Sequence, residues 1–170
     1  MDALIVYESI WGNTKAVAGA VADGLSTRLA VELLDVGSAP SPAGLDVALL
    51  VVGGPTHAFG MSRPQTREDG ARSGGHPGDI GLREWIAAAG EGLRLPVAAF
   101  DTHVRHPNLP GAASKKAAKA LRRAGCTIVA EPESFYVEGK EGPVLPGELE
   151  RARAWGEHLA DLFPEVAPVS

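Results

Sequence analysis

Four short runs of apolar residues restrict the fold of this chain more than any other feature of its sequence. Each has the length of a strand and none alternates polar with apolar side chains; the runs cover residues 3–7, 47–52, 95–100 and 127–130. Continuous apolar runs of this length are typical of strands covered on both faces, as in a parallel sheet. A fifth segment, residues 30–36, alternates more and suits the edge of that sheet.

Helical patterns separate these runs and indicate how the strands are connected. Apolar stripes or strong helix formers occupy residues 14–29, 80–93, 112–124 and 146–163. Strands that alternate with helices form right-handed crossovers and a parallel sheet. We therefore predict one α/β domain over residues 1–170, with a doubly wound, five-stranded parallel sheet of strand order 2-1-3-4-5.

Composition and charge exclude several classes of protein. The net charge is −5, from 16 Lys and Arg against 21 Asp and Glu, which argues against nucleic acid as a partner. The apolar runs are too short to cross a bilayer, and Asp2 stands where a signal peptide carries positive charge. We therefore expect a cytoplasmic protein with no membrane partner. The single cysteine, Cys126, excludes an internal disulfide and is expected in the core.

The loop after residues 3–7 holds the first candidate binding residues. In a sheet of this kind, ligands bind at the carboxyl ends of the strands, between the first and third strands in sequence. The candidates in this loop are Ser9, Trp11, Gly12, Asn13 and Thr14. Their hydroxyl and amide donors join the unpaired N–H groups at the positive end of the following helix, which suits a phosphate. The alternative is that Asn13 or Thr14 only caps the helix.

The order Ser-Ile-Trp-Gly-Asn-Thr in residues 9–14 resembles the phosphate-binding loop of the flavodoxin family. In that family a Ser/Thr-x-x-Gly-x-Thr pattern opens the first helix. The resemblance extends along the whole chain in strand order and length. It implies a flavodoxin-like three-layer sandwich that binds flavin mononucleotide (FMN), with the FMN phosphate on this loop. Trp11 departs from the family pattern, which has Thr or Tyr there, but its backbone N–H is still usable.

The loop after residues 47–52 continues the resemblance. Flavodoxin-like proteins commonly carry Gly-x-Pro-Thr here, and this chain carries Gly-Gly-Pro-Thr in residues 53–56. The resemblance implies cofactor-binding roles for Pro55, Thr56, His57, Phe59 and Gly60, with Met61 as a further candidate beside the flavin ring. An aromatic face stacks on a flavin, and a peptide beside Gly60 could reorient at low steric cost. The alternative is a plain Gly-Pro turn in which Phe59 anchors the loop on the core.

The loop after residues 95–100 is expected to close the other side of the flavin ring. The candidates by resemblance are Asp101, Thr102 and His103. This loop departs from the family because it contains no Tyr or Trp, which puts an aromatic sandwich around the ring in doubt. His103 and His106 are too weak a pattern for a metal pair, so we predict no metal site.

Residues 53–78 form a long segment with little apolar content, which we predict to be a loop. Segments of this length without secondary structure are uncommon and are usually functional or disordered. Arg63, Arg67 and Arg72 could grip an acidic partner or a nicotinamide nucleotide phosphate. The alternative is a solvated excursion of mixed charge.

Together these features predict an FMN-binding protein that mediates electron transfer to a redox partner protein or a small electron acceptor. A small FMN-dependent reductase of quinones or flavins is a close variant. A third hypothesis is a flavodoxin-like binding or regulatory module without redox activity. The chain contains no Gly-x-Gly-x-x-Gly after a strand, no P-loop and no Gly-x-Ser-x-Gly elbow, which argues against three other α/β classes.

Overall fold

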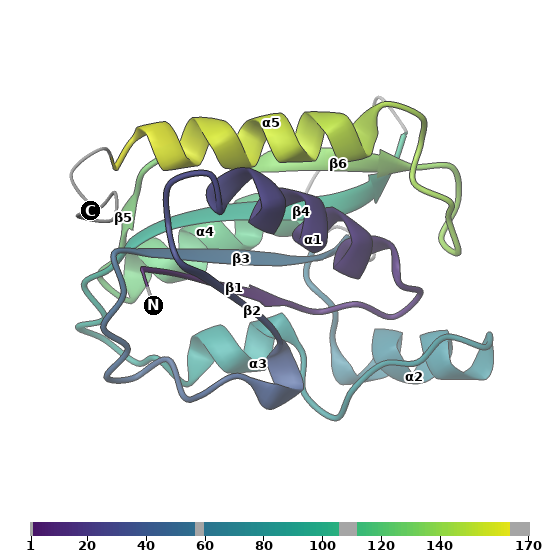
Figure 1. Ribbon diagram of the computed structural model, residues 1–170. Helices are drawn as coiled ribbons and strands as arrows, with labels where there is room; N and C mark the ends of the chain where they lie inside the picture. The colour runs from purple at the N-terminus through teal and green to yellow at the C-terminus, as the bar shows by residue number, and fades with distance from the viewer. Residues whose placement is uncertain (1, 57–59, 106–111, 164–170) are drawn as a thin grey trace.

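The computed structural model describes residues 2–56, 60–105 and 112–163, and it shows a single sheet between two helical layers (Figure 1). The strands are β1 (Ala3–Tyr7), β2 (Val31–Asp35), β3 (Leu49–Pro55), β4 (Pro96–Val104), β5 (Thr127–Ile128) and β6 (Glu133–Val137). They pair in the order β2-β1-β3-β4-β5, with β6 also on β4, and every pairing is parallel. The α/β sandwich and its strand order are therefore confirmed.

The prediction of five strands is wrong at the last position, which two strands share. β5 pairs with the start of β4, where Pro96 lies opposite Thr127, and β6 pairs with its end, where Val104 lies opposite Val137. Pro132 immediately precedes β6 and has no N–H to donate to β4, which accounts for the break in pairing. The residues that pair with the end of β4 thus form a separate strand, β6, which the apolar runs did not predict.

All four predicted helices are present, and a fifth helix lies inside the segment predicted to be a loop. The helices are α1 (Asn13–Leu25), α2 (Pro64–Arg72), α3 (Leu82–Ala87), α4 (Ala113–Arg123) and α5 (Glu148–Asp161). A 3-10 turn, Val36–Ser38, follows β2. Residues 53–78 are therefore not one loop, because α2 begins with Pro64 at its first turn, where the missing N–H costs nothing. The Arg63 N–H donates to Thr66 Oγ1 at 2.7 Å, which closes that turn.

Each face of the sheet has its own apolar core. On one face α1 and α5 cover Phe100 and Phe135, and Trp155 of α5 packs edge-on against both rings at centroid distances of 6.0 and 5.9 Å. On the other face α3 and α4 cover the second cluster, which contains Trp85 and Cys126. The core position expected for Cys126 is confirmed, and Trp85 and Trp155 are buried with it in the two clusters.

Helices α1 and α5 touch through two glycines. A Cβ atom on Gly24 would overlap the carbonyl oxygen of Arg153, and one on Gly156 would overlap the carbonyl oxygen of Val21. Because both obstacles are backbone atoms, no side-chain rotation could relieve the overlap. The close approach of the two helices therefore requires glycine at both positions.

We expect Gly156→Ala to lower the free energy of unfolding by about 2 kcal/mol or more, because the added methyl group must push the helices apart. Urea denaturation followed by circular dichroism measures the change. Gly19→Ala is the matched control on α1: a Cβ atom there meets nothing within 4 Å. That variant should be more stable by about 0.5–1 kcal/mol, because alanine is the better helix former. Equal effects of both substitutions would contradict the steric explanation.

Candidate cofactor-binding site

Gly12 and Ser9 shape the turn between β1 and α1. Gly12 is the N-cap residue of α1 and has φ +91°, a conformation that favours glycine. Ser9 Oγ accepts hydrogen bonds from the backbone N–H of Gly12 at 3.0 Å and of Lys15 at 3.4 Å, which leaves its own O–H as a donor. The alternative that Asn13 or Thr14 caps α1 is wrong, because both residues lie inside the helix.

Three threonines hold the loops after β1, β3 and β4 together. The hydroxyl groups of Thr14 and Thr102 lie 2.7 Å apart in the interior and form a hydrogen bond between α1 and β4. The Thr56 N–H donates to the carbonyl oxygen of Thr102 at 2.9 Å. Thr56 Oγ1 accepts from the N–H of Ala113, the first residue of α4, at 3.1 Å. The candidate residues from three separate loops are thus joined directly by hydrogen bonds.

A small pocket of about 60 Å³, partly open to solvent, lies among these loops. Seven of its lining residues were predicted from sequence: Ser9, Trp11, Asn13, Thr14, Pro55, Thr56 and Thr102. Four further lining residues were not predicted: Ile10, Val104, Val137 and Lys140. Val137 ends β6 and Lys140 follows it, so both were missed along with that strand. The run of aromatic and β-branched residues Phe-Tyr-Val in residues 135–137 was the available signal.

No protein-family model and no curated protein sequence matches the chain, whereas solved structures do. It is similar to a flavodoxin from the domain Archaea, with TM-score 0.66 and 21% sequence identity over 95% of this chain and 98% of that one. Oxidised flavodoxin 1 from Bacillus cereus gives TM-score 0.69 at 15% identity, over the same shares of the two chains. A WrbA-like flavodoxin protein from Agrobacterium tumefaciens gives 0.59 at 16% identity, over 96% and 98%.

The chain has the flavodoxin-like fold. In this fold the loops after β1, β3 and β4 meet at the carboxyl edge of the sheet, which is where the pocket lies. A second recess, of about 460 Å³, opens on the other side of the loop of residues 9–14, toward β2. Gly12 and Lys15 line that recess together with Tyr7, Asp35 and His76, while Ser9 and Trp11 line both.

The remaining predicted residues lie away from the pocket or outside the described residues. Asp101 is fully buried, and its Oδ2 accepts the N–H of Ser114 at 2.9 Å, which fixes the start of α4. His103 lies on the opposite face of β4 from Thr102, with its ring 6.4 Å from that of Tyr136. The predicted contacts of Asp101 and His103 with a flavin ring therefore stay predictions.

Three described residues of the segment that follows β3 are buried: Gly60, Met61 and Ser62. Gly60 is buried close to Lys116 and Arg83, and Met61 packs into the core cluster under α3 and α4. His57 and Phe59 lie outside the described residues, so their predicted roles beside the flavin ring stay predictions.

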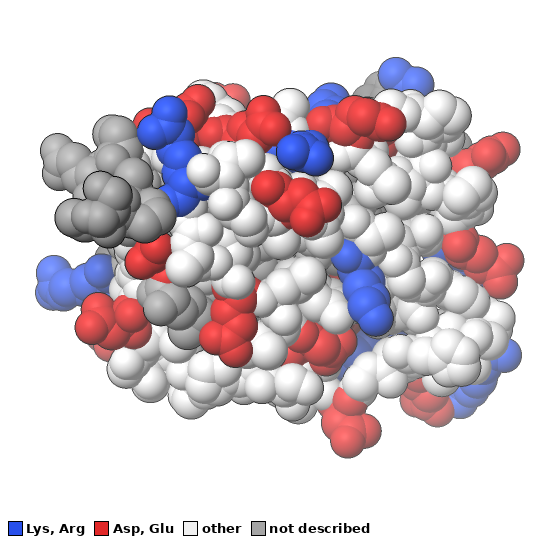
Figure 2. Space-filling model, in the orientation of Figure 1, with Lys and Arg blue, Asp and Glu red and all other residues white. Residues whose placement is uncertain are grey.

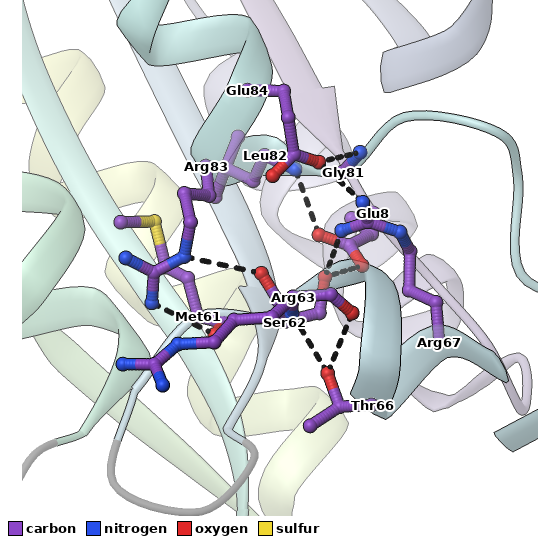
Figure 3. Close-up of polar contacts among 10 residues, drawn as sticks. All are labelled: Glu8, Met61, Ser62, Arg63, Thr66, Arg67, Gly81, Leu82, Arg83 and Glu84. Atoms are coloured by element: carbon purple, nitrogen blue, oxygen red, sulfur yellow. Dashed lines mark hydrogen bonds and ion pairs between the residues drawn. The ribbon is translucent and has the colours of Figure 1, made fainter. Parts of the chain in front are cut away.

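A buried carboxylate joins the end of β1 to α2 and α3 (Figure 3). Glu8 is 2% exposed, and its carboxylate accepts the Leu82 N–H at 2.8 Å and the O–H of Ser62. Arg67 Nη1 donates to Ser62 Oγ at 2.9 Å, and its Nη2 lies 2.6 Å from Glu84 Oε1. Burial is the largest influence on Glu8 and raises its pKa, and the hydrogen bonds from Ser62 and Leu82 oppose that effect.

The three arginines of the predicted long loop have different surroundings. Arg67 is buried and paired inside this network, so both hypotheses for it, a grip on an outside ligand and a solvated position, are wrong. Arg72 lies on the surface 2.5 Å from Glu68, as expected for a solvated segment of mixed charge. Arg63 is exposed.

Two features are absent from the part of the chain that the structure describes. Residues 2–56, 60–105 and 112–163 contain no cluster of three or more His, Cys, Asp or Glu placed to hold a metal ion. No helix in the same part of the chain is long and apolar enough to span a membrane.

The bond between Thr14 and Thr102 can be tested with a double-mutant cycle. Thr14→Val or Thr102→Val alone should lower the free energy of unfolding by about 1–3 kcal/mol, because each leaves the other hydroxyl buried without a partner. The double variant should lose less than the sum of the two, with a coupling of about 1 kcal/mol. Urea denaturation of all four proteins gives the four values. Strict additivity would show that the two hydroxyls do not depend on each other.

The raised pKa of Glu8 predicts a pH dependence of stability. A raised pKa means that the folded state holds this proton more tightly, so the stability that Glu8 contributes falls as pH rises from about 4.5 through the folded pKa. The stability of the wild type relative to Glu8→Gln should therefore fall over that range. Urea denaturation at a series of pH values measures it.

Glu148 provides a control of opposite sign for the Glu8 experiment. The hydrogen bond from Arg151 lowers the pKa of Glu148, so its contribution is lost as pH falls below about 4.5 through the folded pKa. The stability of the wild type relative to Glu148→Gln should rise with pH in that range. The same slope in both pairs would contradict the assigned directions.

Proposed function

We propose that this protein binds FMN and transfers electrons. One observation carries the proposal: Ser9, Asn13, Thr56 and Thr102, from the ends of β1, β3 and β4, line one pocket at the start of α1. Backbone N–H groups and the helix dipole favour an anion at that point. The similarity to flavodoxins adds support, because the fold places the same three loops together.

The residues of the pocket fit the parts of FMN. The Ser9 O–H, the Asn13 amide and the first N–H groups of α1 would hold the phosphate. The apolar lining residues Ile10, Val104 and Val137 would exclude water from the region beside it. FMN supplies one-electron and two-electron chemistry when it is bound, and the chain's own task is to bind, orient and shield it. The flavin ring would lie between the loops after β3 and β4.

The surface charge bears on the electron-transfer partner. The net charge of −5 disfavours the extra negative charge of a reduced flavin and would lower its potential modestly. The face seen in Figure 2 carries acidic and basic side chains intermixed. That face therefore has no broad patch of one sign that would steer a charged partner protein.

A small FMN-dependent reductase is the second candidate function, and one observation favours it. The recess of about 460 Å³ beside the loop of residues 9–14 has room for a small molecule, and Trp11 lines both this recess and the pocket. A quinone or a free flavin accepted there would make the protein an enzyme rather than a carrier. Oxidation of NADH or NADPH by the FMN-loaded protein, with and without a quinone, separates the two.

FMN binding is tested by titrating FMN with the purified protein and following flavin fluorescence. We expect quenching at micromolar protein and a flavin spectrum that dithionite bleaches reversibly. A protein that leaves FMN fluorescence unchanged would falsify the proposal and favour a module without redox activity. A reducible spectrum rejects that module.

Gly12→Ala is expected to weaken FMN binding about tenfold, because a Cβ atom at φ +91° distorts the turn that carries the donors. Gly44→Ala is the matched control, since Gly44 has φ +84° and equally open surroundings but lies outside the loop of residues 9–14 and lines neither the pocket nor the recess. The control should lose stability to a similar extent and keep the affinity for FMN. A loss of affinity in both variants would point to general destabilisation.

A further inference from the structure

The segment between β6 and α5 lies against the phosphate loop. This strap, residues 138–147, folds back on itself: the Glu138 N–H donates to the Pro143 carbonyl at 3.0 Å, and Val137 and Val144 form an antiparallel bridge. Gly142 of the strap packs so closely on Asn13 that a Cβ atom would overlap the Asn13 amide. The strap therefore fixes one side chain of the phosphate loop and brings its own residues to the pocket.

Lys140 of the strap is the only charged residue among those that line the pocket in the described part of the chain. Its ammonium group lies 6.0 Å from the centre of the Trp11 ring and 3.5 Å from Ser73 Oγ at the end of α2. No ion pair joins Lys140 to an acidic side chain within the described residues. An ammonium group without a carboxylate partner thus stands at the pocket that holds the phosphate donors.

We propose that Lys140 is the counter-cation of the FMN phosphate and makes the site select phosphorylated over unphosphorylated flavin. This inference rests on the proposed function. The other pocket residues are uncharged, so without Lys140 the phosphate would meet only neutral donors and the partial charge of the helix end. A lysine ammonium is a compact charge with three donors, and it strengthens a hydrogen bond to phosphate.

Trp11 lies beside the Lys140 ammonium group and helps to position it. Its indole ring gives the ammonium group a surface beside the phosphate loop, and a cation near an aromatic face is attracted to it. This accounts for the departure from the flavodoxin pattern at that position, where Thr or Tyr is expected. The flexible four-carbon stem of lysine then lets the ammonium group leave Ser73 for the phosphate.

Lys15 is much closer than Lys140 to residues 9–14 in the sequence, but we do not assign it the role of counter-cation. Lys15 directly follows residues 9–14 in the sequence, but it lines the recess on the β2 side and not the pocket. The two lysines therefore carry the same charge on opposite sides of one loop. Lys15→Met is a matched control for Lys140→Met.

The test is a fluorescence titration of FMN and of riboflavin, which lacks the phosphate, with wild type, Lys140→Met, Lys140→Arg and Lys15→Met. Lys140→Met should raise the Kd for FMN about tenfold and change the Kd for riboflavin less than about twofold. Lys140→Arg should keep most of the selectivity. Lys15→Met should change the Kd for FMN less than about threefold. Sodium chloride should weaken FMN binding more in the wild type than in Lys140→Met.

Two results would overturn the role of Lys140: an unchanged FMN-to-riboflavin ratio in Lys140→Met, or an equal loss of selectivity in Lys15→Met. In both cases the wild type still binds FMN, so the proposed function stands. A wild type that binds neither flavin overturns the proposed function and this inference together. Lys140 is exposed, and thermal unfolding of Lys140→Met should match the wild type.

Discussion

The parallel register of β1, β3 and β4 is the constraint on which the rest of the structure depends. Tyr7 lies opposite Gly53, and Gly53 lies opposite Phe100, so the three strands deliver their following loops to one edge of the sheet. A shift of one residue in any strand would turn its core side chains outward. The same shift would separate the three threonines, whose bonds cross between the loops. Fold and pocket are therefore specified by the same pairing.

The sequence predicted those strands whose residues form a continuous apolar run or alternate polar with apolar side chains. β1 coincides with the first predicted apolar run. β2 alternates polar and apolar residues, as predicted for a strand at the edge of the sheet. β6 was missed because it is only five residues long and begins with two polar residues directly after a proline, as a linker would. α2 escaped because its nine residues are almost wholly polar, so no apolar stripe marks them. Lys140 was missed as a consequence, since its place depends on β6.

The candidate site likewise contains residues that the local sequence predicts and residues that only the folded chain brings together. The part of the pocket formed by residues 9–14 could be predicted, because these residues are contiguous and their chemistry is local. The partners of Glu8 could not be predicted, because Ser62 and Leu82 lie far away in sequence and only the packing of α2 and α3 brings them to it. Gly81 belongs to the same packing: a Cβ atom there would overlap Arg67 and crowd Ser62 and Glu8 at 2.7 and 2.8 Å. The residues next to Gly81 in the sequence therefore give no sign that glycine is required at this position.

The contact between Gly24 and Gly156 has a consequence for comparing relatives of this protein. Because backbone meets backbone there, the two positions cannot change independently: a relative with a larger residue at either one must hold its first and last helices further apart. The first helix begins at Asn13, one of the residues that line the pocket, so its outward displacement would move that side of the pocket as well. The residue found at these two positions thus serves as a simple marker of helix spacing across a set of aligned sequences.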